Sequence, residues 1–366
     1  MIPKICLCMI VKNEAHIISR CLESVKPLLQ TWVIEDTGST DNTEAVVEDV
    51  YKDLFGLYHY ADWIDFSTNR NHVLEIARAA THCDYILIMD ADDYLVFDDI
   101  SVFDNLTAPA YSIMIKHGSI SYPRPQLIST KIAAEYVGVL HEYLDLKGTP
   151  CIPLEKCHII YGAAGSRSKD PEKYIKDAKV FEKALETDPN NARYTFYCAQ
   201  SYRDAGYLSK ALDYYGKRVC MGGPNDEQFV AALENAKIME LLVSKGDLDI
   251  ETDDIAMRYI EASVINPSRN EAIIALSKLW RKRDMWEYAY FYATQAAKFH
   301  KPIGSLFLED ACYDWMPYDE MAVSGWYIGK KRETISLNKY LLSLNCIPQD
   351  AKDRIEKNLA WCQEHI

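Results

Sequence analysis

A short apolar run that ends in acidic side chains constrains this chain more than any other stretch. Residues 86–89 read Ile-Leu-Ile-Met and are followed at once by Asp90, Ala91, Asp92 and Asp93. Such runs are typical of buried strands, and open α/β sheets bind ligands at the carboxyl ends of their strands. Asp90 and Asp92 would leave the same face of an extended backbone, so a divalent ion such as Mg²⁺ or Mn²⁺, bridging to substrate phosphates, would offset their repulsion. The alternative is that the acidic residues only cap the strand and solvate a turn.

The N-terminal half alternates predicted strands with predicted helices. Strands are predicted at 4–11, 31–35, 56–60 and 86–89, with apolar residues at helical spacing between them. This alternation predicts an α/β domain with a three-layer, mostly parallel sheet. Asp36 follows the second strand, and Arg70 lies in the first turn of a helix, where the dipole disfavours a cation. Both are therefore candidates for ligand contact, with a solvated arginine as the alternative for Arg70.

Composition narrows the classes of partner and compartment. The 366-residue chain has a formal net charge of -14, which argues against a nucleic-acid groove or an anionic membrane surface as its main partner. No apolar run approaches the roughly 20 residues that span a bilayer. The run at 5–11 is broken at once by Lys12 and lacks a signal-peptide cleavage site. Cysteines number 11 and form no C-x-x-C pair, so we expect buried, reduced thiols and a cytoplasmic protein.

Four motifs in a fixed order carry a family resemblance. They are Ile-Val-Lys-Asn-Glu at 10–14, Ile-Glu-Asp-Thr-Gly-Ser-Thr-Asp-Asn-Thr at 34–43, Phe-Ser-Thr-Asn-Arg-Asn at 66–71 and Met-Asp-Ala-Asp-Asp at 89–93. Together they resemble the family 2 glycosyltransferases of the GT-A fold. The resemblance implies a nucleotide-sugar donor, most often a UDP-sugar, and a divalent metal, Mn²⁺ or Mg²⁺, on its diphosphate.

Carried over by position, the resemblance also implies roles for individual residues at the donor site. Val11 and Glu14 would border the nucleoside, Asp36 would contact the base with Arg70 nearby, Asp90 and Ala91 would lie at the ribose, and Asp92 would hold the metal.

The match becomes weaker after Asp93. Residues 137–144 contain His141 and Glu142 and resemble the G-x-x-H-E segment of a glycosyltransferase subgroup. In an inverting enzyme the attacking acceptor hydroxyl must lose a proton, for which Glu142 is the candidate base and His141 the alternative. A glutamate that faces solvent at a strand edge is the other interpretation. His158 matches a position where relatives place a histidine near the metal or diphosphate, and a purely structural histidine is the alternative.

Two further segments complete this half. Strands are predicted at 111–115 and 126–129, with a rigid proline loop at 122–125. The small-residue stretch 162–170 carries Arg167 and Lys169 and is typical of a mobile lid that closes over a diphosphate. An interdomain linker is the alternative for this stretch.

The C-terminal half has a helical pattern and an internal repeat. Four positions recur at one constant offset: Ala184, Pro189, Ala199 and Ala211 correspond to Ala262, Pro267, Ser277 and Ala289. Within each set the spacing resembles the tetratricopeptide pattern, with repeats of roughly 34 residues. Gly222-Gly223 would start a middle repeat, and 248–254 would be an insertion. Such solenoids bind peptides or proteins or form dimers, so a homo-oligomer through the helical domain is a further prediction.

The predicted organisation is therefore a GT-A domain at 1–168, tetratricopeptide-like repeats at 169–300 and a helical cap at 301–366. The predicted function is metal-dependent transfer of a sugar from a nucleotide-sugar, taken as a UDP-sugar by resemblance, to a hydroxyl of a glycan or protein, with inversion at the anomeric carbon. The alternatives are a catalytically inactive binding scaffold and a nucleotidyltransferase. The absence of a Gly-rich phosphate loop near the N-terminus disfavours the nucleotidyltransferase.

Overall fold

The computed structural model describes residues 2–80, 82–117, 120–162, 170–223, 225–302, 305 and 307–365. The polypeptide divides into two compact units, Met1–Ala184 and Leu185–Ile366. The three-part division predicted from the sequence stays a prediction. Across the described ranges, we find no helix that combines the length and the apolar character needed to cross a bilayer.

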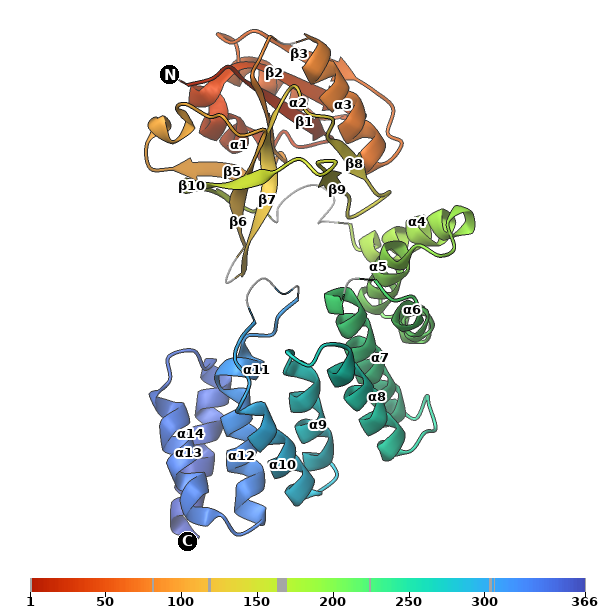
Figure 1. Cartoon of the computed structure of the whole chain (residues 1–366), viewed down its shortest axis with the longest axis vertical. Helices are drawn as coiled ribbons and strands as arrows, with labels where there is room; N and C mark the ends of the chain where they lie inside the picture. The colour runs from red at the N-terminus through yellow and green to blue at the C-terminus, as the bar shows by residue number, and fades with distance from the viewer. Residues whose placement is uncertain are drawn as a thin grey trace. The chain divides into compact units, whose positions relative to one another are not determined.

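The first unit is built on a mixed sheet with the strand order β3-β2-β1-β4-β7-β6-β10-β5 (Figure 1). Its strands are β1 (Ile5–Val11), β2 (Leu29–Asp36), β3 (Gly56–Tyr60), β4 (Tyr85–Ile88), β5 (Tyr94–Phe97), β6 (Ala110–His117), β7 (Ile120–Ser129) and β10 (Cys151–Ile160), while β8 (Glu135–Val137) and β9 (Tyr143–Asp145) form a separate pair. The first four strands run parallel, and β7 and β5 are antiparallel to their neighbours. The predicted α/β class is therefore confirmed.

Helices cover both faces of this sheet, because successive side chains of a strand point to opposite sides. The helices are α1 (Ile18–Val25), α2 (Thr43–Val50) and α3 (Phe66–Ala80). Leu7 of β1 packs in one core with residues of α1 and α2, and Cys8 packs in a second core with residues of α3. Because β1 to β4 are parallel, their carboxyl ends lie at one edge of the sheet, and the loops that follow them meet there.

The prediction of a proline loop at 122–125 is wrong, because β7 runs through it. Pro123 and Pro125 pair with Met114 and Ser112 of β6. On its other side β7 pairs with β4 only at Leu127–Ser129. Prolines are tolerated where a strand edge is open and their missing N–H removes no ladder bond.

The second unit is a series of helices, most of which pack on the next helix along the chain (Figure 1). The helices are α5 (Ala192–Asp204), α6 (Leu208–Cys220), α7 (Asn225–Lys245), α8 (Thr252–Ile265), α9 (Glu271–Arg281), α10 (Trp286–Ala296), α11 (Ala311–Asp314), α12 (Met316–Tyr327), α13 (Lys331–Ser343) and α14 (Gln349–Glu364), and α4 (Lys173–Thr187) crosses the boundary between the units.

The predicted repeat is present in these helices. Ala199 and Ala211 lie buried where α5 meets α6, and Ser277 and Ala289 lie buried where α9 meets α10. The two inter-helix turns also match, since Gly206 has a φ of 82° and the corresponding residue of the second turn, Asp284, a φ of 58°. The helical unit is therefore tetratricopeptide-like.

One buried ion pair stabilises this unit, and it gives a testable prediction. Arg269 donates to both carboxylate oxygens of Glu271, at 2.7 and 3.0 Å, and both side chains are almost fully buried. Breaking such a pair from one side costs about 3 kcal/mol. We expect Glu271→Gln to lower the free energy of unfolding by about this amount at neutral pH, measured by urea unfolding. The exposed pair Arg258–Glu261 provides the control, because Glu261→Gln should change stability by less than about 0.5 kcal/mol.

The same pair predicts a pH dependence. Burial alone would raise the pKa of Glu271, but Arg269 holds it below its usual 4.5. The charged form therefore contributes stability above this usual value, and the contribution is lost as the pH falls through the lowered pKa. Glu271→Gln should show a shallower loss of stability than the wild type on acidification, and an equally steep loss would contradict the assignment.

Candidate functional site

The loops after β1 and β2 are tied together at the carboxyl edge of the sheet. Val11 and Asp36 are register partners, and the Val11 carbonyl oxygen accepts hydrogen bonds from the backbone and the hydroxyl of Thr37. Asn13, with a φ of 57°, accepts from the Thr40 backbone N–H at 2.7 Å. The backbone N–H of Glu14 donates to the hydroxyl of Thr43. Val11 and Glu14 thus lie beside the loop that follows Asp36.

Asp36 has a structural task that the sequence did not reveal. Its Oδ1 accepts from the backbone N–H groups of Gly38 and Ser39, at 3.0 and 2.7 Å, and its Oδ2 accepts from the Tyr58 hydroxyl at 2.7 Å. The side chain is buried. In this conformation Asp36 shapes the loop after β2.

An alternating cluster of carboxylates and guanidinium groups follows β4. Arg70 of α3 donates to Asp90 Oδ1 at 2.6 Å and to Glu142 Oε1 at 2.7 Å. Arg124 of β7 lies 3.4 Å from Asp90 Oδ2 and 3.2 Å from Asp93 Oδ2. The structure therefore brings together three predicted site residues, Arg70, Asp90 and Glu142.

The two carboxyl groups nearest Arg124, those of Asp90 and Asp93, have pKa values that are shifted in opposite directions. Burial alone would raise the pKa of Asp90, but the guanidinium groups of Arg70 and Arg124 hold it down at about 2. Burial, reinforced by the charge of Asp90, raises the pKa of Asp93 to about 7. Asp90 is thus a permanent anion, and Asp93 is neutral in part at neutral pH.

The turn that presents Asp92 is held from several sides. The Asp93 N–H donates to the Asp90 carbonyl oxygen, and Arg20 donates to the Asp92 carbonyl oxygen at 2.9 Å. The Gly162 N–H donates to Asp93 Oδ1 at 3.0 Å. A Cβ at Gly162 would lie 2.0 Å from the Asp92 carbonyl oxygen, so only glycine fits against this turn. Ala91 is buried within the turn, whereas Asp92 is partly exposed.

The segment that carries Glu142 is anchored to α3. Asn71 and Tyr136 exchange a pair of hydrogen bonds, at 2.8 and 2.6 Å, between the asparagine amide and the tyrosine backbone. The Arg70 guanidinium lies 5.4 Å from the centre of the Tyr136 ring. One turn of α3 therefore positions both the carboxylate of Glu142 and the strand that precedes it.

The two predicted histidines lie in other surroundings. His141 has a φ of 52° and stacks on Phe181 of α4 with ring centroids 6.2 Å apart. His158 pairs with Val96 within the β10–β5 ladder, four positions before Gly162, the residue that contacts Asp92. On an extended strand this separation is about 13 Å. The structure thus does not bring His158 to Asp92, and its titration responds to burial and to Lys116 instead, which lower its pKa.

Sequence reasoning missed three contributors to this site, namely Arg20, Arg124 and Gly162. Because 122–125 was predicted as a loop, Arg124 was not placed in the sheet beside the strand that precedes Asp90. Gly162 lies two positions after the end of β10, and this position was a signal that could have been used. The predicted lid residues Arg167 and Lys169 lie outside the described residues.

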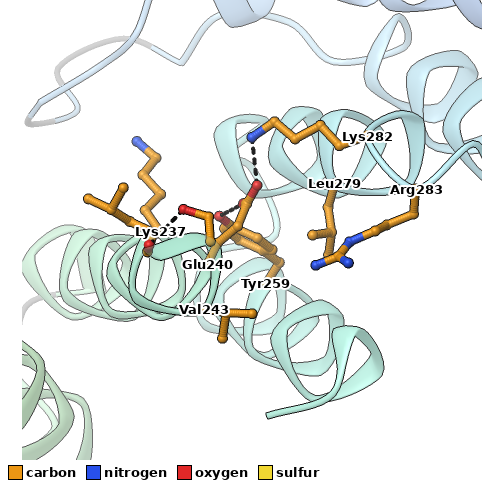
Figure 2. A pocket seen from close by; sticks show the side chains of 9 residues that line it. Lys237, Glu240, Val243, Tyr259, Leu279, Lys282 and Arg283 are labelled. Carbon is orange, nitrogen blue, oxygen red and sulfur yellow. Dashed lines mark hydrogen bonds and ion pairs between the residues drawn. The ribbon is translucent and has the colours of Figure 1, made fainter. Parts of the chain in front are cut away.

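The helical unit has a hollow of its own, of about 590 Å³, between α7, α8 and α9. Figure 2 shows Glu240 at its centre, where it accepts hydrogen bonds from the Tyr259 hydroxyl at 2.8 Å and from Lys282 at 2.6 Å. Lys237 and Arg283 also line the hollow. The acidic group in this hollow is therefore already paired within the protein.

Comparisons with known proteins agree with the two-part organisation. Residues 6–104 match the family model described as glycosyl transferase family 2. A TPR repeat-containing protein of Synechococcus elongatus is 32% identical over 151 residues, which cover 39% of this chain and 36% of that protein. The chain thus spans little more than a third of the curated relative's length.

Two solved structures were compared as well. The crystal structure of S. aureus TarS 1-349 aligns with a TM-score of 0.38 and 13% identity, covering 71% of this chain and 91% of that chain. A tetratricopeptide repeat protein from Parabacteroides merdae aligns with a TM-score of 0.38 and 15% identity, covering 52% of this chain and 66% of that chain. The chain therefore matches family 2 glycosyltransferases over residues 6–104 and continues into a tetratricopeptide-like helical unit.

Proposed function

We propose that this chain transfers a sugar from a nucleotide-sugar, of the UDP type, to an acceptor hydroxyl with inversion at the anomeric carbon. The observation that carries the proposal is the convergence of residues from separate motifs at the carboxyl ends of parallel strands. Arg70, Asp90 and Glu142 meet through two short ion pairs, and Asp92 lies on the adjoining turn. The family match covers all of these except Glu142.

The residues present fit a divalent ion at Asp92. Asp90 is engaged by two arginines, and Asp93 is buried against Arg124 and Gly162. Asp92 is partly exposed, as is Asp90, whereas Asp93 is buried. Mg²⁺ and Mn²⁺ are commonly held by one or two carboxylates together with substrate phosphates. When bound, such an ion supplies Lewis-acid stabilisation of the charge that develops on the departing diphosphate.

Glu142 is the proposed base for the acceptor. Arg70 engages Oε1, so we assign the acceptor proton to Oε2 of the same carboxylate. The acceptor oxygen forms a bond to the anomeric carbon as its O–H bond breaks and as the bond to the diphosphate oxygen breaks. The electron pair of that last bond leaves with the nucleoside diphosphate. Asp90, held at a pKa of about 2 by its two arginines, is too weak a base for this step and instead orients Arg70.

The acceptor we propose is a glycan or a protein side chain. The tetratricopeptide-like unit supports this part of the proposal, because solenoids of this kind bind peptides and proteins. Recognition of an acceptor by the helical unit and catalysis by the first unit would then be separate tasks.

The first test is nucleotide binding by calorimetry on the full chain, with UDP in the presence and absence of Mn²⁺. We expect binding to be at least tenfold tighter with Mn²⁺, because an ion held by Asp92 would offset the charge of the diphosphate. Incubation with UDP-sugars and an acceptor should release UDP. Release of pyrophosphate would identify a nucleotidyltransferase instead, and no binding of UDP or any other nucleotide with or without metal would favour the scaffold.

A further inference from the structure

A second group of metal-ligand side chains lies away from the proposed donor site. It consists of Glu35 of β2, His59 of β3 and His72 of α3, whose ligand atoms all lie within 4.8 Å of one another. Glu35 and His59 are register partners in the β2–β3 ladder, so the sheet itself sets them side by side. His72 is brought in by α3, with its Nδ1 at 2.5 Å from Glu35 Oε2.

The carboxylate of this group is already oriented. Glu35 is fully buried, and its Oε1 accepts from the Asn69 side-chain amide at 2.9 Å. Asn69 is itself buried and fixed, since its Oδ1 accepts from the Ile64 N–H at 3.0 Å. The remaining oxygen of Glu35 faces His72. Metal-binding carboxylates in proteins are commonly held in this way by a hydrogen bond from an outer residue.

The two imidazoles complete a set of three ligands. The rings of His59 and His72 have centroids 5.2 Å apart and meet edge to face. The His72 side chain is 46% exposed, so solvent reaches the group from one side. Two histidines, one glutamate and an accessible fourth position form a ligand set that suits Zn²⁺. Ligands around a tetrahedral zinc ion are about 3.3 Å apart, so the histidine and the glutamate would separate by less than about 1 Å on binding.

The group is distinct from the proposed donor site. Arg70 and His72 are two positions apart on α3, which places them about 200° apart around the helix axis. Arg70 pairs with Asp90 and Glu142, whereas His72 pairs with Glu35. The next residue of β2, Asp36, points to the opposite face of the strand, where Tyr58 of β3 holds it.

We propose that Glu35, His59 and His72 form a second metal site that binds Zn²⁺ or a similar borderline divalent ion. An ion there ties β3, the outermost strand of the sheet order, to β2 and to α3. Because Tyr58 of the same strand holds Asp36, the ion also rigidifies the loop after β2. A simple hydrogen-bonded pair between His72 and Glu35 is the competing explanation, but it does not account for the presence of His59 beside this pair.

The test is zinc binding by the full chain after removal of metals with a chelator. Isothermal titration with Zn²⁺, and the absorption spectrum of bound Co²⁺, should show one tight site in the wild type. His59→Ala and His72→Ala should each weaken this site at least tenfold, and the double variant should abolish it. Asp92→Asn should leave zinc binding at Glu35, His59 and His72 unchanged, because it alters only the proposed ligand of the metal at the donor site. His300→Ala, which removes an exposed histidine of the helical unit, should also keep it.

Thermal unfolding gives a second readout that does not depend on catalysis. Zn²⁺ should raise the unfolding temperature of the wild type but not that of the double variant, whose temperature without metal shows whether it is folded. The proposal is overturned if the folded double variant binds Zn²⁺ as the wild type does, or if the wild type shows no site. Neither result would bear on UDP binding, so this proposal and the proposed function fail independently.

Discussion

Replacing Asp92 by asparagine is expected to lower sugar transfer about a thousandfold while the fold stays intact. The Asp92 carboxylate lies on a turn. Arg20 holds this turn through the Asp92 carbonyl oxygen, and Gly162 holds it through the Asp93 carboxylate. The conformation of the turn therefore does not depend on the charge of the Asp92 side chain. Asparagine has nearly the same shape but only a neutral amide oxygen to offer a hard cation. Loss of a group that stabilises charge developing in the transition state costs about a hundredfold to a thousandfold in rate.

The measurement is the rate of UDP release with an acceptor, over a range of Mn²⁺ concentrations. If Asp92 holds the metal, excess Mn²⁺ should restore part of the activity of the variant, because the weakened site can still be filled. Asp98→Asn, at an exposed aspartate after β5, is the matched control and should keep wild-type activity. Transfer by Asp92→Asn at more than about a tenth of the wild-type rate would remove Asp92 from the proposed mechanism.

The fold of this chain is predictable where a pattern is repeated. Alternating apolar strands and amphipathic helices identify the α/β unit, because burial on both faces of the sheet demands continuous apolar strands. In the helical unit, Ala199 and Ser277 recur at equivalent positions because two helices can approach closely only over small side chains. Such features depend on local periodicity, which the sequence displays directly.

The candidate site is less predictable because its partners are distant in the sequence. The predicted position of Arg70 in the first turn of a helix indicated contact with a ligand, and the structure adds two acidic partners that the sequence did not reveal, Asp90 and Glu142. Sequence reasoning left the contact of Asp36 with the base as a prediction and did not find its three donors, which include Tyr58 from the neighbouring strand. It also failed to find Arg124, since two prolines concealed a strand whose open edge tolerates them. Register and strand order decide these contacts, and neither can be read from local periodicity.

Arg70 offers the second large effect, because one guanidinium group holds two carboxylates. Arg70 donates to Asp90 and Glu142 at 2.6 and 2.7 Å, and its side chain is 12% exposed. Arg70→Met approximately keeps the length of the side chain but leaves two largely buried carboxylates without their shared partner. We expect the free energy of unfolding to fall by about 3 kcal/mol, as for other buried ion pairs broken from one side. We expect transfer to fall about a hundredfold, since Glu142 loses the contact that positions it.

Two further variants separate stability from catalysis. Arg70→Lys should recover part of the stability, because an ammonium group can reach one carboxylate but cannot bridge both in the geometry of a guanidinium. Combining Arg70→Met with Glu142→Gln removes one uncompensated charge, so stability should rise above that of Arg70→Met alone while transfer stays low. Urea unfolding and the rate of UDP release measure the two effects. Lys52→Met, which breaks an exposed pair with Asp49, is the control and should leave both unchanged. If transfer returned together with stability in the double variant, Glu142 would not be the base, and Arg70 would serve only to hold the fold.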